Sequence, residues 1–275
     1  VADVGGGYLG VGTDQGYLMI DWVRPEVAWL IDYDAEVMVV HELYRRFFLG
    51  AQAPEDFIAL WSRDAREAAR DLLLADTEPG EGRRLVEAWE TYRAEIHRRL
   101  GKVAGRMGKK GVPCYLVDPE RYAYVQQMLR DGRIRPMLAN LLDDEAIMGI
   151  AQAAQALEVP IRVIYLSNAE QYWKRYSPQY RLNVAALPLH EDAVVLRTLL
   201  RGSIDKDFHY GTQRAINYVS WLQAPYVRNV YDITGRPEAE KGTLSFFRSD
   251  GDPERSAVGR RWKAAEAKRA GTAEQ

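Results

Sequence analysis

The first forty residues alternate between short apolar runs and polar turns, which predicts strands of a buried parallel sheet. Residues 8–11 lead into a glycine turn, and residues 27–31 end at Asp32. Both runs are too short for helices, and strands that are covered on both faces need no polar alternation. The intervening residues 14–22 can form a helix, and Pro25 precedes the second run. The pattern predicts a strand, a helix and a second strand.

A longer stretch, about residues 36–107, carries apolar residues at helical spacing. Val37, Val40, Leu43 and Phe47 fall on one helix face, and later parts of the stretch repeat this pattern with many arginines on the opposite face. The period is typical of amphipathic helices. Because the stretch is longer than one crossover between strands requires, we expect an additional helical layer inserted into the domain.

Strands and helices alternate again after this insertion. Apolar runs predict strands at residues 134–138, 161–166 and 193–198, and helical spacing predicts helices at 143–157 and 211–223. This order is typical of an α/β protein with an open, mostly parallel sheet.

The carboxyl-terminal part of the chain differs in composition. Beyond Gly235 it turns polar, and residues 260–275 contain almost no aliphatic core formers. We therefore expect one α/β domain over residues 1–235 and a polar, flexible tail over 236–275, in which residues 260–275 are a poor candidate for a packed element.

The glycine turn after the first strand is the leading candidate for a ligand site. Gly10 and Gly12 let a backbone pass close to a ligand and aim N–H groups at its polar atoms. Asp32 lies 22 positions after Gly10, where a carboxylate can accept both hydroxyls of a ribose, and Asp34 is the neighbouring alternative. A second interpretation is that the glycines only make a tight turn and that Asp32 caps the following helix.

The spacing of the glycines narrows the choice of ligand. Gly10, Gly12 and Gly16 follow G-x-G-x-x-x-G, whereas a dinucleotide fingerprint needs G-x-G-x-x-G, and the chain has no phosphate-binding loop ending in G-K-S or G-K-T. The pattern favours a nucleoside without a pyrophosphate, such as S-adenosylmethionine.

Polar residues also follow two later strands. Ser167 and Asn168 come directly after the strand at 161–166, and Asn140 follows the strand at 134–138. Open α/β sheets bind ligands at the carboxyl ends of their strands, so these side chains are candidate ligand contacts. Helix capping by Ser167, Asn168 or Asp143 is an equally reasonable interpretation.

His209 is a candidate general base, although a lone histidine is more often a packing residue. His41, His97 and His190 have no second ligand at helical spacing, so we predict no metal site. The single cysteine, Cys114, excludes an internal disulfide.

The charge balance bears on the partners. The 275 residues carry 37 basic and 39 acidic side chains, a net charge of -2, which lacks the positive excess of a nucleic-acid binder. No run approaches the ~18 apolar residues of a membrane span, and residues 1–12 do not resemble a signal peptide. We expect a cytoplasmic protein that contacts neither nucleic acid nor membrane.

Four segments of the chain resemble those of a poorly characterised bacterial family with an S-adenosylmethionine-dependent, class I, Rossmann-like methyltransferase fold. The similarity spans about residues 5–225. The segments are Tyr8-Leu9-Gly10-Val11-Gly12-Thr13-Asp14-Gln15, Ile31-Asp32, Tyr165-Leu166-Ser167-Asn168-Ala169-Glu170-Gln171-Tyr172 and Phe208-His209-Tyr210.

The resemblance implies a methyltransferase acting on a small molecule or a peptide, with S-adenosylmethionine as cofactor. Substrate contacts would come from Glu170, Tyr172, His209 and Tyr210. The cofactor would lie against Gly10, Gly12, Thr13, Asp14, Gln15, Asp32, Asp34, Asn140, Leu141, Ser167 and Asn168.

A non-catalytic binding or scaffold protein that keeps this fold is the alternative. Methyltransferases usually carry an acid just before the glycine turn, where this chain has Tyr8-Leu9. The arginine-rich face of residues 81–107 is either a partner surface or a solvated face, and the second interpretation is favoured.

Overall fold

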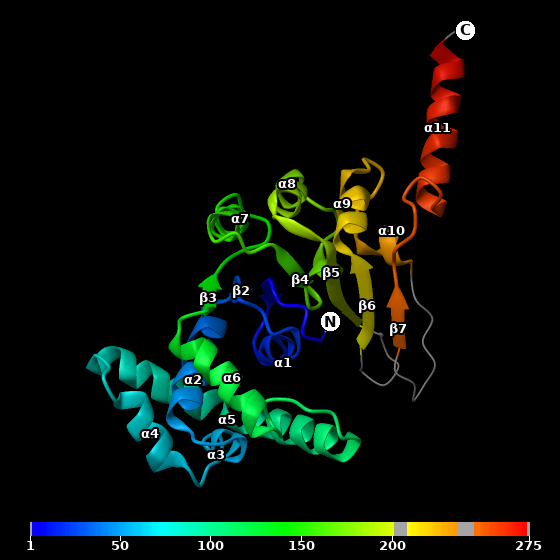
Figure 1. The fold of residues 1–275 in the computed structure, drawn as a ribbon. Coiled ribbons are helices and arrows are strands. Elements are labelled where there is room, and N and C mark those ends of the chain that lie inside the picture. Colours follow the sequence, from blue (N-terminus) through cyan, green and yellow to red (C-terminus); the bar gives the residue numbers. More distant parts are fainter. Residues whose placement is uncertain (1, 201–207, 236–244, 274–275) are drawn as a thin grey trace. The chain divides into compact units, whose positions relative to one another are not determined.

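A computed structural model describes residues 2–200, 208–235 and 245–273 of the chain (Figure 1). Its seven strands follow the order β3-β2-β1-β4-β5-β6-β7 in the sheet. The pairs β2–β3, β1–β4, β4–β5 and β6–β7 are parallel, and β5–β6 is antiparallel. This arrangement confirms the predicted α/β class with a mostly parallel sheet, and it is compatible with a Rossmann-like fold.

The chain divides into two compact units, which are described separately. The first unit holds residues up to Gly5 and Gly12–Leu138, and the second holds Gly6–Val11 and Ala139–Gln275.

The first unit consists of one parallel strand pair and six helices. Its elements are α1 (Asp14–Val23), β2 (Val27–Asp32), α2 (Ala35–Gly50), α3 (Pro54–Ala59), α4 (Arg66–Leu74), α5 (Pro79–Lys110), α6 (Pro119–Arg130) and β3 (Ile134–Leu138). Helices fill most of the stretch 36–107, as its apolar spacing predicts.

An aromatic cluster forms the centre of this unit. It joins α1, α2 and α3 to α6 and to the segment before α6, with neighbouring ring centroids 4.3 to 6.5 Å apart. Such contacts add to the stability that burial of large rings already provides. Its members are Tyr17, Tyr44, Phe47, Phe48, Phe57, Trp61, Tyr115 and Tyr122.

Capping side chains fix where several helices begin. Asp34 accepts the Glu36 N–H at the start of α2, and Asp118 accepts two N–H groups at the start of α6. Gly111, with φ of +64°, ends α5 in the left-handed conformation that glycine adopts without strain. The boundaries of these helices therefore follow from local sequence.

The second unit carries the other strands and the remaining helices. Helices α7, α8 and α9 pack in succession, and α9 covers β5 and β6 (Figure 1). The elements are β1 (Gly7–Val11), α7 (Ala146–Ala156), β4 (Ile161–Tyr165), the 3-10 helix η1 (Ala169–Tyr172), α8 (Pro178–Ala186), β5 (Leu189–Leu200), β6 (Phe208–Arg214), α9 (Ala215–Gln223), α10 (Val230–Thr234), β7 (Ser245–Arg248) and α11 (Ala257–Ala273).

One expectation about this unit is wrong. We expected a helix over 211–223, but residues 211–214 form the end of strand β6, and the helix begins only at Ala215. Within the polar stretch beyond Gly235, Ser245–Arg248 form strand β7, which pairs with β6 from His209↔Ser245 to Thr212↔Arg248. Because backbone N–H and C=O groups form the strand pair, β7 can join the sheet although its neighbourhood in the sequence is polar.

Candidate functional site

The glycine turn after β1 lies against the end of β2. Gly12 has φ of +91°, and a Cβ there would meet no atom within 4 Å. Its N–H donates to the Ile31 carbonyl at 3.1 Å, which brings the turn beside the residue that precedes Asp32. Gly12 and Asp32 both belong to the first unit. The structure therefore brings together two of the residues on which the predicted nucleoside site depends.

The other two glycines serve packing. A Cβ on Gly10 would collide with the ring of Tyr8, which is fully buried. Gly10 makes room for this ring. Packing alone therefore explains why a glycine stands at position 10, without a ligand beside it. Gly16 lies against Leu30, where a Cβ would come within 2.7 Å of a methyl group. It allows α1 to pack closely on β2.

Asp14 places a carboxylate at the amino end of α1. It accepts hydrogen bonds from Tyr44 Oη at 2.7 Å and Thr13 Oγ1 at 3.1 Å, and it forms an ion pair with Arg99 at 2.7 Å. The next residue, Gln15, is exposed. A helix amino end ordinarily favours anions. Here Asp14 lies in the first turn of α1 without capping it and is paired with Arg99, so a phosphate would have to compete with this carboxylate.

Asp32 and Asp34 have different roles. Asp34 Oδ1 accepts the Glu36 N–H at 2.9 Å and caps α2, so the capping interpretation applies to Asp34 and not to Asp32. Asp32 Oδ1 accepts the Asp34 N–H at 3.1 Å. Burial, with a smaller contribution from the Asp34 charge, raises the pKa of Asp32. Within the described part of the chain, no ion pair involves Asp32.

Residues 140–143 form a turn at the start of the second unit. Asn140 Oδ1 accepts the Leu142 N–H at 3.0 Å, and the buried Leu141 offers its carbonyl to Asn183 at 3.0 Å. Asp143 Oδ1 accepts N–H groups at the beginning of α7, which is the capping role considered for it. The side-chain oxygen of Asn140 is thus already used in a hydrogen bond within this turn.

Ser167 has a strained backbone at the carboxyl end of β4. Its φ is +51°, and the Thr198 N–H donates to its carbonyl at 2.7 Å. Of the other described non-glycine residues with positive φ, Arg24, Asp76 and Glu158 lie at helix carboxyl ends, where this conformation is common. Ser167 instead follows a strand. Strain of this kind clusters at functional sites.

A pair of variants measures this strain. We expect Ser167→Gly to be more stable than Ser167→Ala by about 1 kcal/mol, because only glycine adopts positive φ without a steric cost. Both variants lack the hydroxyl, so the comparison isolates the backbone. Urea unfolding of the two variants gives the difference, and an alanine variant as stable as the glycine variant would contradict it.

Glu170, three residues after Ser167, lies in a buried ion pair. Its side chain is 1% exposed and its Oε2 accepts from Arg197 Nε at 2.7 Å. Tyr176 and Tyr218 donate to Oε1 at 2.6 and 2.8 Å. Burial raises the pKa of both phenols well above the usual value, so they remain neutral donors. Both carboxylate oxygens are therefore occupied.

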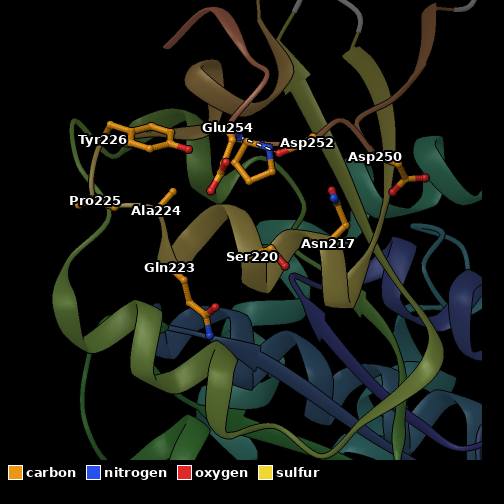
Figure 2. A pocket seen from close by; sticks show the side chains of 10 residues that line it. Asn217, Ser220, Gln223, Ala224, Pro225, Tyr226, Asp250, Asp252 and Glu254 are labelled. Carbon is orange, nitrogen blue, oxygen red and sulfur yellow. Dashed lines mark hydrogen bonds between the residues drawn. The ribbon is translucent and has the colours of Figure 1, made fainter. Parts of the chain in front are cut away.

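The same network extends toward a surface hollow. Arg197 Nη1 donates to Gln213 at 2.9 Å, and Gln213 donates to Asn217 at 2.8 Å. Figure 2 shows Asn217 in the wall of an open hollow of about 590 Å³. Its other lining residues are Ser220, Gln223, Ala224, Pro225, Tyr226, Asp250, Asp252, Pro253 and Glu254.

The remaining substrate-contact candidates are spread over the second unit. Tyr172 is 70% exposed and its Oη accepts from Asn168 Nδ2 at 3.2 Å. His209 is nearly buried in β6, opposite Leu199, and Tyr210 is half-buried. The exposure and contacts of Tyr172, His209 and Tyr210 do not single out one of them as a general base.

His41 was not singled out as a site residue, yet it lies at the glycine turn. It is 1% exposed on α2, with Nδ1 3.1 Å from Tyr17 Oη and the ring beside the Gly12 backbone. His41 and Gly12 are 29 positions apart, and no motif joins them, so only the fold brings them together.

The site residues divide between the two units. The first unit holds Gly12, Thr13, Asp14, Gln15, Asp32 and Asp34. The second holds Gly10, Asn140, Leu141, Ser167, Asn168, Glu170, Tyr172, His209 and Tyr210.

One group of side chains has metal-ligand chemistry. His190, Glu191 and Asp192 offer atoms within 4.8 Å of one another. However, His190 Nε2 lies 2.9 Å from the guanidinium of Arg162, and its Nδ1 faces the Asp192 N–H at 3.1 Å. Both partners are donors, and a neutral imidazole accepts at only one ring nitrogen, so one of them already occupies the nitrogen that could bind a metal ion. The adjacent guanidinium of Arg162 also opposes a metal ion by its charge.

Among the described residues, no helix has both the length and the apolar character needed to cross a membrane. A search of the curated proteins finds no match to the chain. Residues 1–249 match a family described as a domain of unknown function, DUF7790. Since the match covers most of the sequence, the chain belongs to the DUF7790 family.

Proposed function

We propose that the glycine turn and Asp32 bind the ribose of a nucleoside and that the chain is an S-adenosylmethionine-dependent methyltransferase. One observation carries the nucleoside site: the Gly12 N–H bonds the Ile31 carbonyl, which brings the glycine turn beside Asp32. Asp32 is half-buried and has no cationic partner within the described part of the chain. A carboxylate in this position can accept both ribose hydroxyls.

The charge of the turn supports a ligand without phosphates. Asp14 places a carboxylate in the first turn of α1, where it would compete with a pyrophosphate both for the helix end and for Arg99. S-adenosylmethionine joins a nucleoside to a positively charged sulfonium and carries no phosphate. Its chemistry therefore suits this end of the first unit better than that of a dinucleotide.

Bound there, S-adenosylmethionine would supply an activated methyl group. The chain's own contribution would be to orient the ligand through Asp32 and Gly12 and to exclude water. A base is needed only if the acceptor arrives protonated. Because both oxygens of Glu170 are occupied, Glu170 is better suited to hold the loop at 167–172 than to take that proton. The acceptor is a small molecule or a peptide.

Binding without transfer is the second candidate function. The commitment of Glu170 to the buried ion pair favours it, because this removes a candidate base. Methyl transfer to any acceptor, in a screen of metabolites and peptides with radiolabelled S-adenosylmethionine, would dispose of this candidate.

Asp32→Asn tests the ribose assignment. We expect about a tenfold or greater loss of affinity for S-adenosylhomocysteine, because an amide cannot accept from both hydroxyls. Calorimetry gives the affinity. Asp34→Asn is the matched control, since asparagine also caps helices and Asp34 makes no ribose contact in this proposal.

Comparison of the affinity losses in the two variants shows which of the two carboxylates binds the ribose. Equal losses in both variants, or a loss confined to Asp34→Asn, would refute the placement of the ribose on Asp32. Tighter binding of ATP or NAD than of S-adenosylhomocysteine by the unaltered protein would refute the choice of cofactor.

A further inference from the structure

The last helix of the second unit has little contact with that unit. α11 extends away from β7 and α10 (Figure 1). At its base the Trp262 ring lies 6.0 Å from the ring of Tyr226, and Lys263 Nζ lies 2.8 Å from Glu254 Oε2. Beyond these contacts, residues 264–270 are all exposed. A helix without a buried apolar face is marginal on its own, and it is typical of helices that bridge to a second body.

The charge of α11 is opposite to that of the rest of the chain. Its six charged side chains are exposed and give a net charge of +4. Since the whole chain has 37 basic and 39 acidic side chains, the rest has 32 and 38, a net charge of -6. A second copy of the chain therefore attracts α11, whereas a nucleic acid would be repelled by the rest of the chain. The six residues are Arg260, Arg261, Lys263, Glu266, Lys268 and Arg269.

An acidic hollow lies at the base of α11. It is the open hollow of about 590 Å³ between α9, with the loop that follows it, and the segment before α11 (Figure 2). Asp250, Asp252 and Glu254 contribute three carboxylates to its wall, and none of the described residues that line it is basic. These acids pair with cations of their own copy, but the cationic side chains are 57–88% exposed. Exposed pairs of this kind are weak, so the carboxylates stay available to a further cation.

An aromatic pair joins the helix to the hollow. Tyr226 lines the hollow, Trp262 lies on α11, and both are half-buried. Accessible Trp and Tyr side chains with a polar rim around them are typical of protein–protein interfaces, where they often contribute most of the affinity. The base of α11 thus combines an apolar centre with an acidic hollow and a basic helix.

We propose that two copies of the chain associate about a two-fold axis, with the distal half of each α11 over the acidic hollow of the other copy. A helix rises about 1.5 Å per residue, so Arg269 lies about 9 Å further along the axis than Lys263, which contacts Glu254 of its own copy. The distal charges therefore extend beyond their own hollow. A two-fold axis lets one pair of surfaces form the contact twice. All these residues belong to the second unit, and the inference is independent of the proposed nucleoside site.

Sedimentation velocity over a series of protein concentrations tests the association of the unaltered protein. We expect an equilibrium between monomer and dimer at low salt. At about 1 M salt the Debye length falls to about 3 Å, so the dissociation constant of the dimer should rise about tenfold or more. A protein that is monomeric at every concentration in low salt would overturn the inference, and so would a dimer that does not respond to salt.

Two charge-reversal variants identify the surfaces. The helix variant carries Lys268→Glu and Arg269→Glu, and the hollow variant carries Asp252→Lys and Glu254→Lys. Each variant alone brings like charges together at both contacts, so each should raise the dissociation constant of its dimer about tenfold or more. In an equimolar mixture each altered surface meets the opposite charge on the other variant. The mixed dimer should therefore form about as readily as the dimer of the unaltered protein.

The control variant carries Lys109→Glu and Lys110→Glu, an equal charge reversal in the last turn of α5. It should dimerise like the unaltered protein, and thermal unfolding checks that every variant remains folded. If the helix and hollow variants weaken the dimer but their mixture does not restore it, α11 and the hollow do not meet and the inference is wrong. An unaltered monomer that binds duplex DNA, with binding lost in the helix variant, would assign α11 to a nucleic acid instead.

Discussion

Replacing Arg197 with methionine is expected to destabilise the protein by about 3–5 kcal/mol, because it leaves a carboxylate buried without its counter-charge. The Arg197–Glu170 pair has side-chain exposures of 0% and 1%, so water cannot replace the lost partner. Glu170→Gln should cost a similar amount for the opposite reason, since it strands the guanidinium. Urea unfolding of each variant measures the loss.

A double-mutant cycle and a surface control complete this test. The variant carrying both Arg197→Met and Glu170→Gln should lose clearly less than the sum of the single losses, because neither charge is then left alone. Arg98→Met breaks an exposed pair with Glu95, with side-chain exposures of 62% and 53%, and should cost at most about 1 kcal/mol. Single losses as small as that of Arg98→Met would show that the buried pair contributes little.

This ion pair illustrates a limit of sequence reasoning. Glu170 stands in a polar segment after a strand, which favours a ligand contact or a helix cap. Its actual partners, Arg197, Tyr176 and Tyr218, lie between 6 and 48 positions away. The sequence around a buried charged residue does not differ from that around an exposed one when its partner comes from another element. The burial of Glu170 could therefore not be predicted.

The strands show which part of the fold local pattern does determine. The runs at β1, β2, β3 and β4 are short and apolar, and each forms a strand close to the predicted position. In β6 the residues alternate between buried and half-buried, yet the helical spacing of the apolar residues in α9 predicts a helix that begins four positions too early, at 211. Antiparallel pairing with β5 decides the outcome there.

The glycine turn was found for a reason that is partly correct. Gly12 does need positive φ, and Asp32 does end the next strand, so the motif identified their proximity. Gly10 instead accommodates Tyr8, a packing requirement that leaves the same residue type in the same place. Glycine spacing alone cannot distinguish space for a side chain from space for a ligand.

Lowering the pH from 7 to 4 is expected to remove about 3 kcal/mol of stability through His41 alone. The folded state holds this imidazole neutral, with burial lowering its pKa to about 4 from an ordinary value of 6.5. Between these two values the unfolded chain binds a proton that the folded chain does not. Stability from His41 is therefore complete above pH 6.5 and falls as the pH drops toward 4.

His41→Phe isolates this contribution, because phenylalanine fills the site and does not titrate. We expect the stability of the unaltered protein, measured relative to His41→Phe by urea unfolding, to decrease by about 3 kcal/mol between pH 7 and pH 4. Tyr122→Phe, which removes a buried phenol but no group that titrates in this range, should follow the unaltered protein in parallel. A constant difference between the unaltered protein and His41→Phe would mean that the folded state accepts the proton on His41 as readily as the unfolded chain does. The ring would then be charged near pH 5, and burial would not be what keeps the imidazole of His41 neutral in the folded protein.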